Sequence, residues 1–268
     1  MKICWNLTNL CNEDCLYCFR ELYERPLPLS DNLVILRKLK TVGIEGITYA
    51  GGEPFLYSEL KDLLIYAKGL GIKNNIITNG TLLREDNLDD YLPYVEKITF
   101  SIDSPSPYVN SDIGRGKDHY EHIKRLIPII HEKYPNIILE INSVVTRTMK
   151  DEVDYMFEAI GREKNFKGVS KWKISRFCPL RGFAKERDRL FGLKDEQFAK
   201  IKEKYDGGQA NFAISVRDFG EIYSNTIVSP KGCLRICEDK EEVTLVENLL
   251  TTSTTEIQKK LSMGGKHV

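Results

Sequence analysis

The segment KICWNLTNLCNEDCLYC, residues 2–18, places three of its cysteines directly after a short apolar run that is typical of a β-strand. Cys11, Cys15 and Cys18 follow the spacing CxxxCxxC. Thiolates at this spacing, on a loop that can wrap around a ligand, suit an iron–sulfur cluster. A tetrahedral zinc site would need a fourth ligand, which the neighbouring sequence lacks. A cluster held by three cysteines leaves one iron open to bind a substrate.

Further along the chain, strand-like runs alternate with amphipathic, helix-like stretches for about the first 180 residues. The expected strands are Ile3–Leu7, Gly46–Ala50, Lys73–Thr78, Lys97–Asp103, Ile137–Val145 and Lys171–Phe177. The expected helices are 31–43, 57–70, 84–94, 117–133 and 149–161. Six βα repeats predict an α/β fold, a partial (βα)6 parallel barrel with its helices outside. The pattern changes after Gly207–Gly208, so we expect the barrel in residues 1–207 and a small C-terminal α+β cap in residues 208–268.

The composition is that of a globular protein without a charge imbalance. The 268 residues include 39 Lys plus Arg and 39 Asp plus Glu, and 41% of them are hydrophobic. This balance argues against a protein held on a nucleic acid polymer or an anionic membrane by bulk charge. No apolar run approaches the roughly 18 residues of a membrane span, and the start of the chain does not read as a signal peptide. We therefore expect a cytoplasmic protein.

The predicted strands separate apolar from polar side chains. In the run Lys97–Asp103, Thr99, Ser101 and Asp103 alternate with large apolar residues, so the two sets point to opposite faces. The apolar set should pack against the helices, which leaves a polar lumen suited to a polar ligand. Some polar residues, Lys171 in particular, could instead lie at the solvent-exposed lower ends of the strands.

Three short motifs directly follow the second, third and fourth expected strands. They are Gly51-Gly52-Glu53-Pro54, Thr78-Asn79-Gly80 and Ser101-Ile102-Asp103-Ser104. Ligand sites in parallel sheets lie at the carboxyl ends of the strands, and paired glycines allow a close backbone approach. All three motifs should therefore meet at the rim that holds the cysteine loop.

With CxxxCxxC after the first strand and GGEP after the second, the chain resembles the radical S-adenosylmethionine (SAM) superfamily. The resemblance implies a [4Fe–4S] cluster on Cys11, Cys15 and Cys18, with the amino and carboxylate groups of SAM on the open iron. In this family an electron from the cluster cleaves SAM into methionine and a 5′-deoxyadenosyl radical, which takes a hydrogen atom from the substrate. It also implies a flavodoxin or ferredoxin as electron donor.

The same resemblance assigns candidate SAM contacts. Tyr17 should lie near the adenine, and the GGEP turn should contact the methionine end. The candidate SAM-binding residues are Tyr17, Gly51, Gly52, Glu53, Thr78, Ser101, Asp103 and Asn142. Two alternatives stay open: Asp103 could cap the segment that follows it, and Asn142 could be a polar core residue with satisfied hydrogen bonds.

Within the superfamily, the chain is most similar to viperin-like enzymes, which remove the 3′-hydroxyl of a nucleoside triphosphate as water. The matching pieces are Cys18-Phe19, Asp103-Ser104, Ile113-Gly114-Arg115-Gly116, Ile141-Asn142-Ser143-Val144, Trp172-Lys173 and Gly264-Gly265-Lys266. Lys171 and Lys173 would supply cations for the triphosphate, with Arg115 as a further candidate.

Several residues depart from that pattern. Glu140 stands where the viperin-like family carries a lysine, and it could pair with Lys173 and cancel the anion site. Thr48 and Ala50 replace polar pocket residues, and Asn225 takes the approximate place of a tyrosine.

The alternative function is a maturase that crosslinks or epimerises a ribosomal peptide. Its support is the C-terminal region, where residues 227–233 and 246–250 and a final helix resemble a degenerate form of the extension of such enzymes. A minor alternative is a non-catalytic iron–sulfur or zinc scaffold, which three cysteines and an intact GGEP disfavour.

Two further groups of residues were candidates for ligands. An auxiliary cluster at Cys178, Cys233 and Cys237 is disfavoured, because two residues four apart on a strand lie roughly 13 Å from each other. Ordinary buried thiols are the default interpretation for them. The histidines form no ligand spacing, and those in residues 119–131 should lie on or beside a solvated helix.

Overall fold

A computed structural model describes residues 1–268 except 22–23, 163, 209–210, 224–225, 239–240 and 265–268. Its strands form one ten-stranded sheet in the order β10-β9-β8-β1-β2-β3-β4-β5-β6-β7. They are β1 (Lys2–Thr8), β2 (Gly46–Gly51), β3 (Lys73–Thr78), β4 (Lys97–Ser101), β5 (Ile138–Val145), β6 (Val169–Arg176), β7 (Ala213–Arg217), β8 (Ile227–Val228), β9 (Leu234–Glu238) and β10 (Glu241–Val246). Asn225 and the Gly265-Lys266 part of the terminal motif lie outside the described residues.

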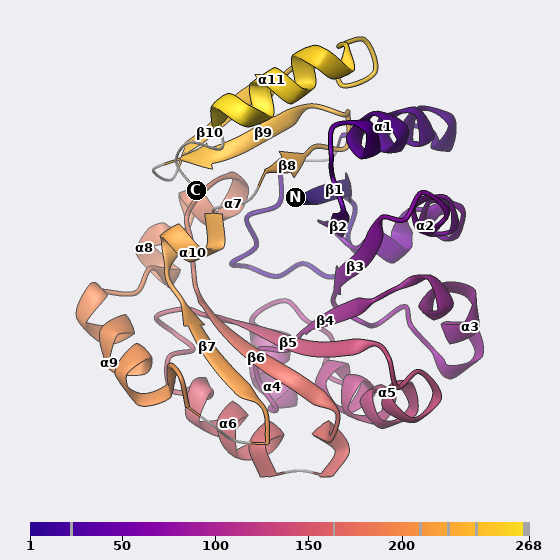
Figure 1. Ribbon diagram of the computed structural model, residues 1–268. Coiled ribbons are helices and arrows are strands. Elements are labelled where there is room, and N and C mark those ends of the chain that lie inside the picture. Colours follow the sequence, from indigo (N-terminus) through magenta and orange to yellow (C-terminus); the bar gives the residue numbers. More distant parts are fainter. Residues whose placement is uncertain (22–23, 163, 209–210, 224–225, 239–240, 265–268) are drawn as a thin grey trace.

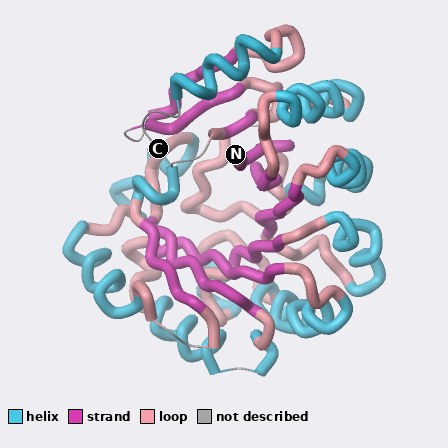
Figure 2. The backbone as a smooth tube through the Cα atoms, viewed as in Figure 1, coloured by secondary structure: helices cyan, strands magenta, loops and turns pink. Residues whose placement is uncertain are grey.

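The helices are α1 (Leu29–Thr41), α2 (Leu60–Gly69), α3 (Leu88–Tyr91), α4 (Pro107–Asp112), α5 (His119–Lys133), α6 (Glu152–Arg162), α7 (Gly182–Glu186), α8 (Asp188–Phe191), α9 (Asp195–Tyr205), α10 (Phe219–Tyr223) and α11 (Thr254–Gly264). Helices α1, α2, α3, α5, α6, α9 and α11 lie on the convex side of this curved sheet, whereas α7, α8 and α10 lie at its open side (Figures 1 and 2). No helix in the described part of the chain is long and apolar enough to cross a membrane.

The strands from β1 to β7 all run parallel, which confirms the α/β partial barrel. The sheet stays open, since no pairing joins β7 to β10 among the residues that the structure places. Each of the six expected strands is present within about two residues of its expected ends.

The last quarter of the chain extends the sheet at both edges. β7 pairs in parallel with β6, whereas β8 pairs in parallel with β1 and leads into the antiparallel strands β9 and β10. The sheet thus runs through the expected boundary at residue 207, and the division into barrel and cap stays a prediction.

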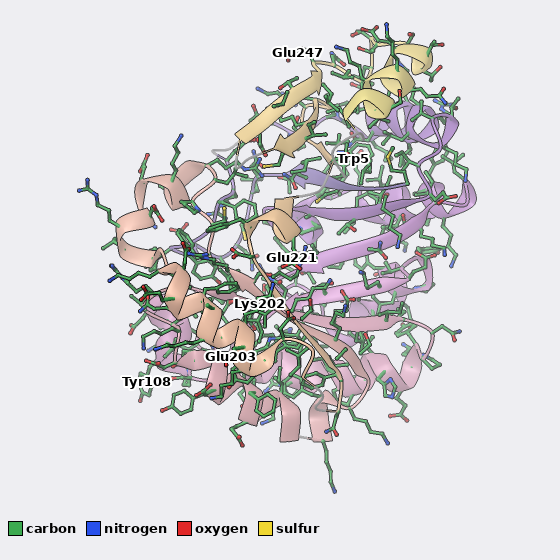
Figure 3. The ribbon with its side chains drawn as sticks, turned by 60° about the vertical axis from the view of Figure 1, so that its left-hand side comes forward. Trp5, Tyr108, Lys202, Glu203, Glu221 and Glu247 are labelled. Atoms are coloured by element: carbon green, nitrogen blue, oxygen red, sulfur yellow. The ribbon has the colours of Figure 1, made fainter. Side chains whose placement is uncertain are left out.

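The alternation of side chains divides the sheet into a dry outer face and a polar inner face. Trp5, Tyr49, Phe100 and Trp172 face the helices and are at most 1% exposed. Burial of each such side chain contributes roughly 1.5–3 kcal/mol of hydrophobic free energy. Figure 3 shows Trp5 inside the molecule and Tyr108, which is 76% exposed, projecting from its surface. The helices and the outer face of the sheet therefore form the core. The polar side chains that alternate with the apolar ones along each strand line the lumen.

Candidate active site

The cysteine loop, residues 9–20, crosses the concave side of the sheet at the carboxyl ends of the strands (Figure 1). The amides of Gly52 and Glu53 donate to the carbonyls of Thr8 (2.6 Å) and Leu10 (2.7 Å) at the start of this loop. In its middle, the Leu16 amide donates to the carbonyl of Ile113 at 2.9 Å. The GGEP turn and the cysteine loop are therefore packed together, as the sequence predicts.

The paired glycines are required by this packing. Gly51 has a φ of +126°, in the region that favours glycine, and a Cβ there would lie 2.3 Å from the Thr8 carbonyl oxygen. At Gly52 a Cβ would lie 1.9 Å from the carbonyl oxygen of Leu10. Any side chain at Gly52 would push the cysteine loop away from the turn.

Gly52→Ala is expected to lower the free energy of unfolding of the cluster-free protein by about 1–3 kcal/mol, because the methyl group overlaps backbone atoms. Urea denaturation measures this loss. Gly69→Ala is the matched control, since a Cβ at Gly69 meets nothing within 4 Å and the residue ends helix α2. Equal stability of the two variants would show that the Gly52 contact is unimportant.

The three cysteines of the loop are partly exposed and form no disulfide. The side-chain Nδ2 of Asn79 donates to the sulfur of Cys11 (3.7 Å), and the thiol of Cys15 donates to Oε2 of Glu13 (3.9 Å). Among the described residues, no three Cys, His, Asp or Glu side chains already converge as metal ligands. The donor set itself fits a [4Fe–4S] cluster, because it offers three soft thiols on one loop and an amide donor beside a sulfur.

Glu53 lies at the junction of β2 and β3. Its carboxylate accepts hydrogen bonds from Oγ1 of Thr78 (2.7 Å), the amide of Asn79 (2.9 Å) and the amide of Phe55 (3.2 Å). Burial raises the pKa of Glu53 to about 7, although the three hydrogen bonds act in the opposite direction. Glu53 is thus a buried, oriented acceptor, and Thr78 holds it in place.

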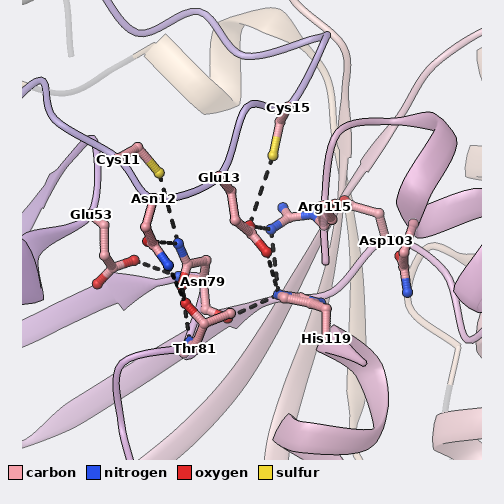
Figure 4. A network of polar contacts seen from close by, with 12 residues as sticks. Cys11, Asn12, Glu13, Cys15, Glu53, Asn79, Thr81, Asp103, Arg115 and His119 are labelled. Atoms are coloured by element: carbon pink, nitrogen blue, oxygen red, sulfur yellow. Dashed lines mark hydrogen bonds and ion pairs between the residues drawn. The ribbon is translucent and has the colours of Figure 1, made fainter. Parts of the chain in front are cut away.

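Arg115 links the cysteine loop to the end of β4 (Figure 4). Its guanidinium donates to Oδ2 of Asp103 (2.6 Å), Oε2 of Glu13 (2.6 Å) and the hydroxyl of Tyr17 (3.0 Å). Tyr17 donates in turn to Asp103. The side chains of Arg115, Asp103 and Glu13 are at most 5% exposed, so two buried carboxylates depend on one cation. The structure therefore brings Tyr17, Asp103 and Arg115 together. Arg115, which the sequence offers as a contact for the substrate, is held here by these buried partners.

His119 corrects the expectation that the histidines lie on a solvated surface. It is 2% exposed, and its Nε2 lies 2.9 Å from the Asn79 carbonyl oxygen. Since a carbonyl accepts, Nε2 carries the proton. Burial and the neighbouring Arg115 hold the pKa of His119 well below its usual value, so the imidazole is neutral. The expectation failed because His119 opens α5 at the end that meets the cysteine loop.

Glu13, Asn79 and His119 are the site residues that sequence reasoning missed. Glu13 had a signal in the sequence, since it lies between Cys11 and Cys15 in the cysteine motif. Asn79 appears in the sequence only as part of the Thr78-Asn79-Gly80 motif, and His119 lies at the first position of α5, four residues after Arg115.

The inner faces of β4, β5 and β6 carry the candidate substrate residues. Glu140 accepts from Lys173, from Lys97 at 3.3 Å and from Oγ1 of Thr99 at 3.2 Å. Burial disfavours ionisation of Glu140, but Lys173 and Lys97 outweigh it and keep its pKa below the usual value. The pairing of Glu140 with Lys173 that the sequence suggested is present. Lys171 is half-buried and lies beside Glu140 in the strand register.

Asn142 and Ser101 lie side by side in the same lumen, nearer the carboxyl ends of the strands than Glu140. They are register partners on β5 and β4, and Oγ of Ser175 donates to Oδ1 of Asn142 at 2.7 Å. Their roles toward SAM stay predictions.

The second group of cysteines lies on other segments of the chain than the loop. Cys178 and Cys233 are buried, and Cys237 is on β9, where burial raises its pKa to about 11. The interpretation of these residues as ordinary thiols stays a prediction.

Comparison with known proteins identifies the family. Residues 5–160 match the Radical SAM superfamily. An S-adenosylmethionine-dependent nucleotide dehydratase of a Thermoplasmatales archaeon is 37% identical over 198 residues, which cover 73% of this chain and 69% of that protein. A protein of the same name from Lacinutrix mariniflava is 29% identical over 214 residues, covering 75% of this chain but 43% of that protein.

Solved structures show the same fold at low sequence identity. The anSMEcpe structure with bound AdoMet and the Kp18Cys peptide has a TM-score of 0.73 and 17% identity, and the match covers 96% of this chain and 79% of that one. Streptococcus suis SuiB bound to S-adenosylmethionine has a TM-score of 0.64 and 17% identity, with 87% and 59% covered. Because the cysteine loop, the GGEP turn and the parallel sheet all agree with the matched family, the chain belongs to the radical SAM superfamily, the family of enzymes whose cofactors are a [4Fe–4S] cluster and SAM.

Proposed function

We propose that this enzyme dehydrates a nucleoside triphosphate by radical SAM chemistry. The observation that carries the proposal is the cationic wall of the lumen, formed by Lys97, Lys171, Lys173 and Arg217 around the carboxylate of Glu140, with Glu221 as a second carboxylate near Arg217. Lys97 and Lys173 both contact Oε2 of Glu140, and Arg217 is the register partner of Ser175, two residues after Lys173 on the same face. Burial lowers the pKa of Lys173, and the charges of Lys97 and Arg217 lower it further. A wall with this excess of positive charge suits a polyanionic substrate. The similarity to two nucleotide dehydratases supports the same substrate class.

The residues divide into cofactor-binding and substrate-binding sets. Cys11, Cys15 and Cys18 would hold the cluster, and when bound, the cluster and SAM supply a carbon radical that removes a hydrogen atom from the substrate. The carboxylate of Glu53 would accept hydrogen bonds from the ammonium group of SAM, because Thr78 and Asn79 already orient it.

The substrate set is on the opposite wall of the lumen. Lys171 and Lys173 would bind phosphate oxygens, with Lys173 exchanging Glu140 for the ligand. The apolar faces of the strands pack against the helices, so one face of the sheet is closed to water. Restricting water and competing hydrogen donors is what a reactive carbon radical requires.

Reduction of the cluster requires an external electron. We include in the proposal a low-potential protein donor of the flavodoxin or ferredoxin type, acting in the cytoplasm. The proposal includes no nucleic acid polymer as a partner, because the cations of the wall lie on the inner faces of the strands and not on an outer surface.

A peptide maturase is the second candidate, favoured by one observation. Glu140 neutralises part of the cationic wall through its contacts with Lys173 and Lys97. A peptide substrate would tolerate this loss of positive charge better than a triphosphate would.

Anaerobic assays of SAM cleavage with each of the four common nucleoside triphosphates separate these candidates. With dithionite as reductant, we expect one triphosphate to raise the rate of 5′-deoxyadenosine formation at least about tenfold and to lose water itself. Lys173→Met should raise the KM for that nucleotide about tenfold or more, because it removes a charge-assisted contact. Lys61→Met is the control, since Lys61 is exposed and pairs with Asp90 at 2.7 Å. No stimulation by any triphosphate would overturn the proposal.

A further inference from the structure

The segment from α7 to α8, residues 182–191, lies directly on the cysteine loop. Ala184 and Phe191 belong to a small buried apolar cluster against which Cys15 and Leu16 pack. Nη1 of Arg187 donates to the carbonyl of Leu16 at 3.0 Å, which ties the segment to the residue next to Cys15. The α7–α8 segment is therefore the layer of protein between this part of the loop and the surface, on the open side of the sheet (Figure 1).

The outer side of the α7–α8 segment is apolar at its centre. Phe183 and Leu190 are 43% and 57% exposed, and Phe19, directly after Cys18, is 37% exposed. Arginines cover two of these rings: the guanidinium of Arg187 is 5.1 Å from the centre of Phe183, and that of Arg181 is 5.5 Å from the centre of Phe19. Large exposed apolar side chains beside a cofactor-binding loop are typical of a contact surface.

Cations surround this apolar centre. Arg147, Lys185 and Arg189 are exposed. Arg147 also donates to the carbonyl oxygen of Arg189, which brings these two arginines together. The exposed Glu186 and Asp188 lie in the same segment, but residues 181–191 carry four cations against these two carboxylates, and Arg147 adds a fifth, so the surface has a local excess of positive charge.

We propose that the α7–α8 segment and Phe19 form the docking surface for a small acidic electron-transfer protein. This inference rests on the part of the proposed function that gives the cluster a protein donor. In the docked complex, one electron leaves the reduced donor and is gained by the cluster on the cysteine loop. No bond is made or broken.

Charge and composition both favour this occupant. Complementary charge steers partners to each other and accelerates association at low ionic strength. Electron-transfer encounters bury little surface, as a segment of this size would. Arginine and aromatic residues are enriched in protein interfaces, whereas a nucleic acid would not require the apolar centre.

The test is the rate at which a reduced flavodoxin reduces the reconstituted cluster, followed optically by stopped flow without SAM or nucleotide. Lys185→Glu/Arg189→Glu is expected to lower the second-order rate constant about 10- to 100-fold at low salt, with a smaller difference at high salt. The rate of reduction by dithionite should be unchanged. The matched control is Lys259→Glu/Lys260→Glu on helix α11, which reverses two exposed charges on the helix that contacts α1.

Two outcomes would overturn the proposal: an unchanged flavodoxin rate in the α7–α8 variant, or an equal loss of rate in the α11 variant. If the rate is unchanged and the α7–α8 variant also loses binding of a single-stranded RNA, the patch is a nucleic-acid surface instead. Because the assay contains no substrate, its result does not depend on whether a nucleoside triphosphate stimulates SAM cleavage.

Discussion

Cys15→Ala is expected to abolish SAM cleavage and to lower the iron content of the reconstituted protein severely. A [4Fe–4S] cluster on three cysteines has no spare protein ligand, and no alternative group of ligands is present among the described residues. The rate of 5′-deoxyadenosine formation with dithionite should fall to that of a reaction without enzyme. Iron and sulfide analysis and the visible absorption of the anaerobic protein measure the loss of the cluster.

Cys178→Ala is the matched control for this experiment. Cys178 is a buried thiol outside the cysteine loop, and its replacement by alanine removes one atom from the core. It should cost about 1 kcal/mol of stability at most and leave the iron content unchanged. A Cys15→Ala protein that keeps its full complement of iron would contradict the assignment of the cluster ligands. An iron loss in Cys178→Ala would instead indicate a second cluster.

Arg115→Ala should be the most destabilising single change outside the apolar core. It leaves Asp103 and Glu13 as buried carboxylates without their common cation. Removing one partner of a buried ion pair typically costs about 3–5 kcal/mol. Chemical denaturation of the cluster-free protein measures this loss separately from any effect on SAM.

Arg84→Ala is the control for Arg115→Ala. Arg84 pairs with Asp86 at 3.2 Å, and both side chains are more than 60% exposed, so its loss should change stability by less than about 0.5 kcal/mol. Adding Glu13→Gln to Arg115→Ala should recover part of the stability, because it removes one uncompensated charge. A loss of less than about 1 kcal/mol in Arg115→Ala would show that water, and not Arg115, satisfies the two carboxylates.

The lumen shows how far local sequence can predict function. Alternation along the strands placed Lys171 and Lys173 in the lumen and suggested that Glu140 would pair with Lys173, which the structure shows. The sequence could not show that Arg217, on β7, adds its charge to the same wall. β7 was expected outside the barrel, and only its pairing with β6 brings Arg217 near Lys173.

Cysteine spacing and side-chain alternation are properties of neighbouring residues, so they were enough to predict the family, the parallel sheet and candidate ligands for the cluster. Which side chains meet Arg115 depends instead on tertiary packing. Glu13 and Arg115 are 102 residues apart, and their contact exists because the turn after Ile113 packs on the cysteine loop. Tertiary packing likewise brought the α7–α8 segment onto the same loop through Arg187 and Leu16, 171 residues apart. Contacts across such separations depend on how whole elements pack, which no local pattern of residues specifies.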